Sequence, residues 1–368
     1  FRGLTMACMI VIDDQSQGGA IYRQLSEDFW DGFRFCNAIF PSFLFIMGAA
    51  IPLALGRYGK VPYRGLGCRK IGLRVAKLFA VGVALNLFAA KFDFPFRIMG
   101  VLQRLALCYA LVAFPFILCP TWVWRLSQVA LPALYALLLL ATPSRDSCGN
   151  HRFSEDCNVG ATVDKAVFGR YMISPTDPEG LLSTLAAALD TYLGAEVGLL
   201  LRRLNRTERD TGNGHPRLRV LAVVAVGSVA CGVAAAALAV IFPVNKKIWT
   251  PSFACLSGAV ALAGFALVFA LLDLWGGSGW TQRAPLPRVA AAESVERGSG
   301  VYQPLHPSSG ALEENGVPTV QNGDRGSGSE WGRCACRMVG RACHVGVGAL
   351  RSMGRNPLVV FVGMVLVE

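Results

Sequence analysis

Seven apolar segments, each roughly 20 residues long, constrain what this 368-residue chain can fold into. A helix of about that length crosses the hydrocarbon core of a bilayer, so each segment can form a transmembrane span. Apolar residues make up 53% of the chain and charged residues 16%, against about 25% charged in soluble domains. The sequence therefore predicts an all-α, polytopic transmembrane bundle. Its spans are expected at about 35–56, 71–90, 97–118, 121–142, 181–201, 219–242 and 252–275, and apolar runs at 1–12 and 356–367, interpreted as truncated spans, bring the number to about nine.

The same composition excludes several other classes of protein. A disordered chain needs low hydrophobicity. A small disulfide scaffold needs more than about 8–10% cysteine, whereas this chain has 12 cysteines. The net charge of +11 is explained by the loops between spans, so we expect the lipid bilayer as a partner and no nucleic acid.

The charges of those loops predict the orientation in the membrane. Lys and Arg accumulate in short loops on the cytoplasmic side. The loops at 57–77 and 202–219 carry net charges of +7 and +4, whereas those at 13–34 and 143–180 carry −3 and −2. Because basic and acidic loops alternate, we expect the first pair to face the cytosol and the second pair to face the lumen or exterior.

Composition also divides the chain into three parts. Residues 1–276 contain the complete apolar segments and form the expected transmembrane core. Residues 277–343 are dominated by Gly, Ser, Pro and Glu without helical or strand periodicity, which predicts a disordered cytosolic insert. Residues 344–368 are expected to begin the final transmembrane part.

The cysteines differ between the two sides of the predicted membrane. Cys148 and Cys157, in the acidic loop, are nine residues apart and could form a disulfide in an oxidising lumen or remain as thiols. The cysteine-rich stretch at 334–344 lacks the spacing of a structural zinc site, and reversible acylation fits it as well. We predict no metal site.

Ionisable residues near the start of one span predict a functional centre, because such groups are costly in lipid. Arg97, Gln103 and Arg104 open the span at 97–118, and the spacing of the arginines places both on one helix face. Arg104 is too deep to reach the interface easily. We therefore expect it to line a polar cavity for substrate or to form a structural ion pair, with an acidic residue of the span at 181–201 as partner. The candidates for that partner are Asp190 and Glu196.

Three polar clusters lie on the predicted outer face. Each one alone is explained by a solvated loop, but two lysines in a short outer loop go against the charge rule. Together the clusters predict the mouth of a cavity. Their members are Asp13, Asp14, Glu27, Asp28, Trp30 and Asn37, then Asp177, Glu179 and Gly180, and finally Asn245, Lys246, Lys247 and Trp249.

Six short motifs resemble, in order, those of the heparan-α-glucosaminide N-acetyltransferase family of transmembrane acyltransferases. They are FRGL (1–4), FPSFLFIMG (40–48), RIMGVLQRLALCY (97–109), DPEGLLST (177–184), PVNKKIWT (243–250) and GRNPL (354–358). The resemblance implies that acetyl-CoA is the donor in the cytosol and that the amine of a terminal glucosamine of heparan sulfate accepts the acetyl group in the lysosomal lumen. It also implies a multi-pass protein of the lysosome or another endomembrane, for which a homodimer is one possible assembly.

At one position the chain departs from that family. The family's expected catalytic residue is a lumenal histidine, and Glu27 occupies its place in the stretch EDFWDG at 27–32. Asn37 replaces a family aspartate shortly before the FP pair. A carboxylate can serve as a general base when burial raises its pKa, whereas as an acetyl carrier it would form a reactive mixed anhydride. Glu27 therefore favours direct transfer over an acetylated enzyme.

These features predict a membrane acetyltransferase that moves an acetyl group from acetyl-CoA to a lumenal amino sugar or glycosaminoglycan. Glu27 is the predicted base, with Asp14 and Asn37 as further catalytic candidates. Basic residues at 57–77 are candidates to meet the CoA phosphates, or they serve orientation alone. The alternative function is that of a catalytically silent relative acting as a membrane carrier or binding protein. The residues expected to bind substrate or donor are Arg97, Gln103, Arg104, Asp177, Glu179, Asn245, Lys246 and Trp249.

Overall fold

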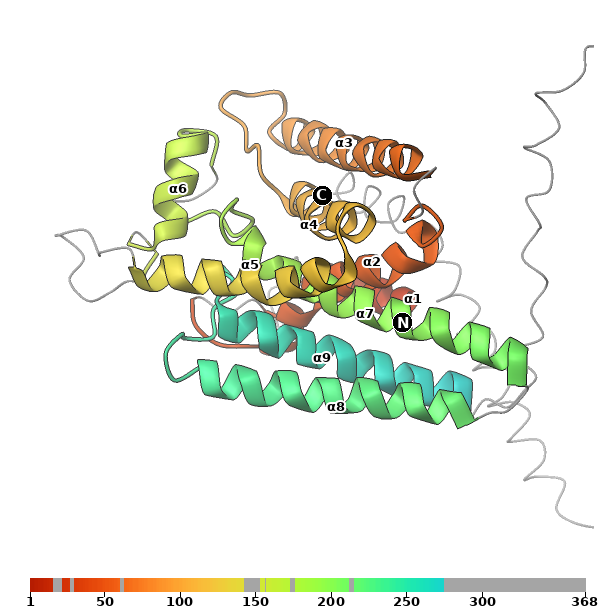
Figure 1. Ribbon diagram of the computed structural model, residues 1–368. Coiled ribbons are helices and arrows are strands. Elements are labelled where there is room, and N and C mark those ends of the chain that lie inside the picture. Colours follow the sequence, from red (N-terminus) through yellow and green to blue (C-terminus); the bar gives the residue numbers. More distant parts are fainter. Residues whose placement is uncertain are drawn as a thin grey trace, which may run out of the picture. The chain divides into compact units, whose positions relative to one another are not determined.

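The computed structural model describes residues 1–15, 22–26, 30–59, 63–141, 153–155, 157–172, 176–211 and 215–274. These residues form helices and connecting loops without any strand, so the predicted all-α class is confirmed. The insert predicted at 277–343 and the last span expected within 344–368 lie outside the described residues. The elements are α1 (Arg2–Gln15), η1 (Phe35–Ala38), α2 (Ile39–Leu55), α3 (Arg64–Ala89), α4 (Val101–Leu118), α5 (Thr121–Ala141), α6 (Val159–Phe168), α7 (Thr184–Thr211), α8 (His215–Leu238), α9 (Pro251–Phe269) and η3 (Ala270–Leu274) (Figure 1).

Seven of the described helical segments are long and apolar enough to cross a membrane. Each coincides with one predicted span, and α1 coincides with the apolar run at the start of the chain. The match confirms the polytopic bundle and identifies an integral membrane protein. The segments are Phe35–Leu55, Arg64–Ala89, Val101–Leu118, Thr121–Ala141, Thr184–Leu204, Arg217–Leu238 and Pro251–Leu272.

Helix α7 is central to the bundle, because it contacts α2, α4, α5, α8 and α9. It approaches α2 closely at two glycines. A Cβ atom added to Gly48 would lie 1.9 Å from the carbonyl oxygen of Thr191, and a Cβ atom added to Gly194 would lie 1.9 Å from the carbonyl oxygen of Phe45, so neither position leaves room for a side chain. Because lipid tails are as apolar as leucine, burying apolar side chains between membrane helices gains little free energy. Membrane helices therefore associate largely through close packing at small residues such as these glycines. Much of α2 and α7 is buried, whereas α3, α5 and α8 are largely exposed on the outside of the bundle.

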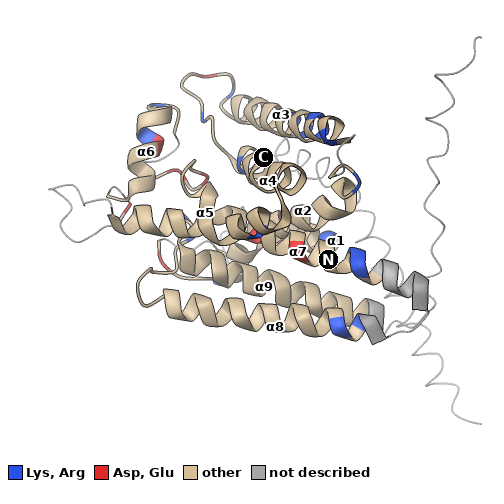
Figure 2. Cartoon of the chain, in the orientation of Figure 1, with Lys and Arg blue, Asp and Glu red and all other residues tan. Residues whose placement is uncertain are grey.

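The two ends of the bundle differ in charge. Figure 2 shows Lys and Arg gathered at the start of α3 and at the adjoining ends of α7 and α8, while most Asp and Glu lie on α6 and in loops at the other end, with a few within α7. We call the first region, the described residues within 57–77 and 202–219, the basic end. The second, the described residues within 30–34, 90–100, 153–183 and 243–250, is the acidic end. The orientation is predicted from loops that include the basic end and residues 30–34 and 153–180, whereas the segments 90–100 and 243–250 carry net positive charge.

Helix α4 begins at Val101, later than the span predicted from position 97. Residues 97–100 are not helical, and the side-chain amide of Asn86 in α3 donates to the carbonyl oxygens of Arg97 (3.0 Å) and Met99 (3.2 Å). These bonds satisfy backbone groups that a helix would otherwise satisfy. The prediction that Arg97 and Arg104 share a helix face is therefore wrong, since only Arg104 is helical.

Helix α6 was not predicted within the acidic loop at 143–180. Its N-cap is Asn158, whose side-chain oxygen accepts from the backbone N–H of Ala161 (2.7 Å). It ends at Gly169, whose φ of 56° lies in the left-handed region that glycine adopts readily. With only 10 residues the helix is too short to span a bilayer, and it lies at the acidic end instead.

Candidate functional site

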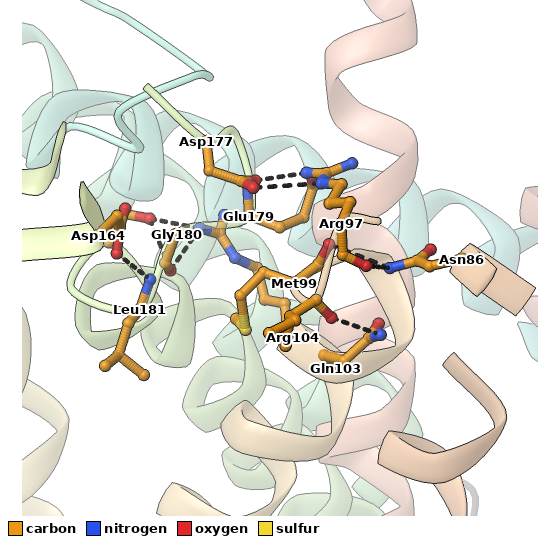
Figure 3. A network of polar contacts seen from close by, with 12 residues as sticks. Asn86, Arg97, Met99, Gln103, Arg104, Asp164, Asp177, Glu179, Gly180 and Leu181 are labelled. Carbon is orange, nitrogen blue, oxygen red and sulfur yellow. Dashed lines mark hydrogen bonds and ion pairs between the residues drawn. The ribbon is translucent and has the colours of Figure 1, made fainter. Parts of the chain in front are cut away.

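A network of polar side chains at the acidic end joins the region around the start of α4 to the segment before α7 (Figure 3). Arg97 forms ion pairs with Asp177 and Glu179, and its Nε donates to Asp177 Oδ2 (3.2 Å). Arg104 Nη2 donates to the carbonyl oxygen of Gly180 (3.1 Å) and to the hydroxyl group of Ser183. Both predicted arginines thus contact residues 177–183, although they come from different local structures.

The two arginines differ in burial. The Arg97 side chain is 22% exposed, whereas Arg104 is fully buried. The Arg104 guanidinium lies 5.0 Å from the centre of the Trp249 ring, a cation–π arrangement. The ring of Trp249 also packs edge-on against Phe40 and Phe253. Arg97 is therefore partly accessible at the surface of the acidic end, and Arg104 lies inside the bundle.

The acidic partners predicted for Arg104 are wrong. Asp190 lies on α7 beside the Ser257 hydroxyl group, which is 3.2 Å from either carboxylate oxygen. Glu196 accepts from Gln128 (3.0 Å) and pairs with Arg125. Arg104 instead contacts a carbonyl oxygen and a hydroxyl group. Its hydrogen-bond partners are therefore uncharged groups rather than the carboxylate of a simple intramembrane ion pair.

The loop before α9 is tightly ordered around Asn245, which is completely buried. Its side-chain oxygen accepts from the backbone N–H of Ile248 (3.1 Å), and its side-chain nitrogen donates to Asp31 Oδ1 (3.1 Å). Tyr135 on α5 donates to the carbonyl oxygen of Ile248. Trp249 has a φ of 49°, a left-handed conformation that is uncommon for a bulky residue and often occurs at functional sites.

The outer loop around Trp30 lies against this segment. Trp30 Nε1 donates to the carbonyl oxygen of Phe153 (2.9 Å), and the Lys247 ammonium group lies 5.7 Å from the centre of the Trp30 ring. The backbone N–H of Gly32 donates to the carbonyl oxygen of Val244 (2.8 Å). Members of all three predicted polar clusters therefore meet at the acidic end.

The other predicted site residues lie in varied places. Gln103 is buried and donates to the carbonyl oxygen of Ile98 (2.9 Å). Asn37 is buried, and its side-chain oxygen accepts from the Cys36 thiol (3.3 Å). Asp14 is exposed near the end of α1 and takes no part in this network, and Lys246 is half-buried in the loop with Asn245.

Two predictions depend on positions that lie outside the described residues. Glu27 is one such position, so its role as the base stays a prediction. Cys157 takes part in a disulfide. Its predicted partner, Cys148, also lies outside the described residues, and the pairing stays a prediction.

Sequence reasoning missed Asp164 of α6. Its carboxylate accepts from the backbone N–H of Leu181 (2.8 Å), and a Cβ on Gly180 would come within 2.0 Å of Asp164 Oδ2. Burial raises the pKa of the Asp164 carboxyl group to about 6. The hydrogen bond from Leu181 and the charge of Arg104 lower this pKa, whereas the negative charge of Asp177 raises it further. The Asn158 cap and Gly169 were the sequence signals that could have revealed α6 and this side chain.

A separate cavity of about 560 Å³ opens at the basic end. The Lys70 ammonium group bonds to the Tyr58 hydroxyl group, and Arg74 lies 4.5 Å from the centre of the Tyr109 ring. Among the described residues, no carboxylate forms an ion pair with a basic side chain of this cavity. Its charge is therefore available to an anionic ligand. The lining residues are Leu53, Ala54, Leu55, Arg57, Tyr58, Lys70, Arg74, Tyr109 and Arg202.

Comparisons with known proteins agree with the motifs. Residues 1–147 match the family model described as heparan-alpha-glucosaminide N-acetyltransferase, catalytic. Heparan-alpha-glucosaminide N-acetyltransferase of Homo sapiens is 23% identical over 76% of this chain and 49% of its own length. For the protein of the same name from Mus musculus the values are 23%, 76% and 50%. The chain thus spans about half the length of these curated relatives, and the resemblance predicted from the sequence is confirmed.

Proposed function

We propose that this chain, a relative of the heparan-alpha-glucosaminide N-acetyltransferases, transfers an acetyl group from cytosolic acetyl-CoA to an amino sugar in the lumen. The observation that carries the proposal is the presence of two polar centres at opposite ends of one transmembrane bundle. The cavity at the basic end offers a phosphate-bearing donor four cations that pair with no described carboxylate, and the acidic end offers carboxylates and hydrogen-bond donors to the chemistry.

The cavity at the basic end suits the nucleotide part of acetyl-CoA. Phosphate groups bind preferentially to Arg and Lys, and Arg can form paired hydrogen bonds to them. Arg57, Lys70, Arg74 and Arg202 line the same cavity. The positive-inside rule explains why such residues lie on the cytosolic side, but it does not require them to surround a cavity.

Helix α4 connects the two centres. Tyr109 lines the basic cavity, and it follows Arg104 by five residues, about 7.5 Å along the axis at 1.5 Å per residue. A donor whose phosphates occupy the basic cavity can therefore direct its narrow thioester arm along α4 toward Arg104. This arrangement keeps the bulky, charged part of CoA on the cytosolic side.

At the acidic end, the proposed reaction is direct transfer. The neutral amine of the sugar forms a bond to the thioester carbonyl carbon, and the bond between carbon and sulfur breaks. Glu27 takes the proton from the amine, and the departing CoA thiolate takes up that proton. Trp30 and Asp31, which follow Glu27 closely, are held against the loop that contains Asn245 and Lys247. The lumen of the lysosome or another endomembrane compartment is the proposed location of the acceptor.

The decisive experiment is acceptor labelling by the purified protein. Acetyl-CoA labelled in its acetyl group is supplied with glucosamine-terminated heparan oligosaccharides, and label in the sugar is measured. We expect label to appear only with both substrates present. If the protein binds CoA but transfers no label, it is a silent carrier or binding protein, and the enzyme proposal is wrong.

A further inference from the structure

Arg104 is fully buried, yet most of its hydrogen-bonding capacity is unused. Nη2 donates to Gly180 and Ser183, whereas Nε and Nη1 have no hydrogen-bond partner within the described part of the chain. Arginine stays charged in proteins, and a buried donor without an acceptor costs free energy. A side chain held in this state is expected where a ligand supplies the acceptor.

Other unused donors surround the same aromatic cluster. Trp249, whose ring lies under the Arg104 guanidinium, has no partner for Nε1 among the residues described. The same holds for the side-chain nitrogen of Asn37, which precedes Phe40 by three residues, and the Phe40 ring packs on Trp249 at 5.6 Å. All of these unpartnered nitrogen atoms are hydrogen-bond donors, and none of them can accept a hydrogen bond. A ligand that completes them must present hydrogen-bond acceptors, such as carbonyl oxygens.

The charge balance favours a neutral oxygen over an anion. Asp177 and Glu179 pair with Arg97, and both also interact electrostatically with Arg104. Two cationic and two anionic side chains leave the centre close to neutral before Asp164 ionises. A sulfate or carboxylate of the sugar would also encounter Arg97 first, since Arg97 is partly exposed and Arg104 is not. An acyl carbonyl group on a narrow arm fits the position better.

We propose that Arg104, through Nε and Nη1 and assisted by Nε1 of Trp249, whose ring lies under the guanidinium, binds the carbonyl oxygen of the acyl thioester. This inference rests on the proposed function. When the amine nitrogen bonds to the carbonyl carbon, the π electrons of the C=O bond move to the oxygen, which becomes negative. The charged donors hold that oxygen until the C=O bond reforms and the C–S bond breaks. Donors that bind developing charge stabilise the transition state more than the ground state.

The test compares two CoA analogues that cannot transfer an acyl group. S-acetonyl-CoA carries a carbonyl group near the position of the thioester carbonyl, and S-propyl-CoA has a methylene group there. Calorimetric titration of the purified full-length protein measures the affinity for each. The wild type is expected to bind S-acetonyl-CoA about tenfold or more tightly than S-propyl-CoA, the usual worth of a hydrogen bond to a charged donor.

Variants assign that preference to the proposed donors. In Arg104→Lys, which keeps the charge but loses the planar fork, the preference should fall to about threefold or less, while affinity for S-propyl-CoA stays unchanged. Trp249→Phe keeps the ring beneath Arg104 and removes only the N–H, and it should reduce the preference severalfold. Thermal unfolding in detergent checks that each variant is folded, and Trp249→Phe remains informative if Arg104→Lys does not fold.

The outcomes separate this inference from the proposed function. If the wild type binds both analogues with equal affinity, or if the folded variants keep the full preference, Arg104 does not bind the carbonyl group and the inference is overturned, while CoA remains the donor. If the wild type binds neither analogue, the donor assignment itself fails and the inference fails with it.

Discussion

The cationic side chains at the two ends of the bundle are used differently. At the acidic end, Arg97 is paired with two carboxylates, and Arg104 is fixed by a carbonyl oxygen and a hydroxyl group. At the basic end, the described residues include no carboxylate paired with the cations that line the cavity. The difference indicates that Arg97 is built into the fold, whereas Arg104 keeps free donors and the cations of the second group keep their charge for a ligand. The second group comprises Arg57, Lys70, Arg74 and Arg202.

The largest expected effect tests whether the chemistry belongs to the acidic end alone. Glu27→Gln should lower turnover by about 10²–10⁴-fold, because a positioned general base contributes that much. Affinity for CoA, assigned to the basic end, should change little. Initial rates of acceptor labelling and calorimetric CoA binding measure the two quantities. Equal activity in wild type and Glu27→Gln would move the chemistry elsewhere, with Asp14 as the next candidate.

Glu27→His provides a matched gain-of-function variant. It restores the residue that the family resemblance places at this position, and we expect it to retain or raise turnover. Imidazole can act as a base near neutral pH or carry the acetyl group itself. If the wild type is inactive and only the histidine variant transfers label, this chain is a silent relative.

The second prediction concerns the structural role assigned to Arg97 and its two carboxylate partners at the acidic end. Asp177→Ala should lower the free energy of unfolding by about 2–3 kcal/mol, somewhat below the usual cost of breaking a buried pair, because Glu179 remains and Arg97 is partly exposed. Arg57→Ala, at the basic end, should change it by less than about 0.5 kcal/mol. Thermal unfolding of both variants in the same detergent makes the comparison. Equal destabilisation would remove the distinction between the two ends.

The sequence was sufficient for the spans but not for these partnerships. A spanning helix satisfies its own backbone hydrogen bonds, so its length and apolarity are visible in one continuous segment. The pairing of Arg97 with Asp177 joins positions 80 residues apart and has no local signature. Only the family motifs indicated that both positions belong to one site.

Arg104 shows why an expected acidic partner was the wrong choice. The prediction considered carboxylates of the facing span, but a guanidinium can also bond to a carbonyl oxygen and a hydroxyl group. Gly180 makes this possible, because its lack of a side chain leaves room for the Asp164 carboxylate next to the loop that binds Arg104. Such a close approach depends on the tertiary fold and cannot be read from spacing.

The third prediction sharpens the role of the basic end. Arg74→Ala should weaken CoA binding about three- to tenfold, with the loss shrinking at high salt, because solvent-accessible charges are screened. Arg64→Ala is the matched control on the same helix, since Arg64 does not line the cavity. Stability should stay the same in both. An equal loss for the two variants would indicate general electrostatic attraction rather than a binding cavity.

The smallest expected effect is a pH dependence confined to the acidic end. Asp164 has a pKa of about 6 in the folded protein against an ordinary value of 3.8, so between these pH values the folded state holds a proton that the unfolded state has lost. The free energy of unfolding should therefore decrease as pH rises from about 4 to 6 and stop changing through this group above that range. Asp164→Asn keeps an oxygen to accept from Leu181 and cannot ionise, so it should remove this slope and unfold at a higher temperature than the wild type at pH 7. Unfolding temperatures of both proteins at pH 4.5, 5.5 and 7 measure the effect. The cations of the basic end stay charged throughout this range, so the control variant Arg57→Ala should show the same dependence of stability on pH as the wild type. If the pH dependence persists in Asp164→Asn, another group is responsible for it.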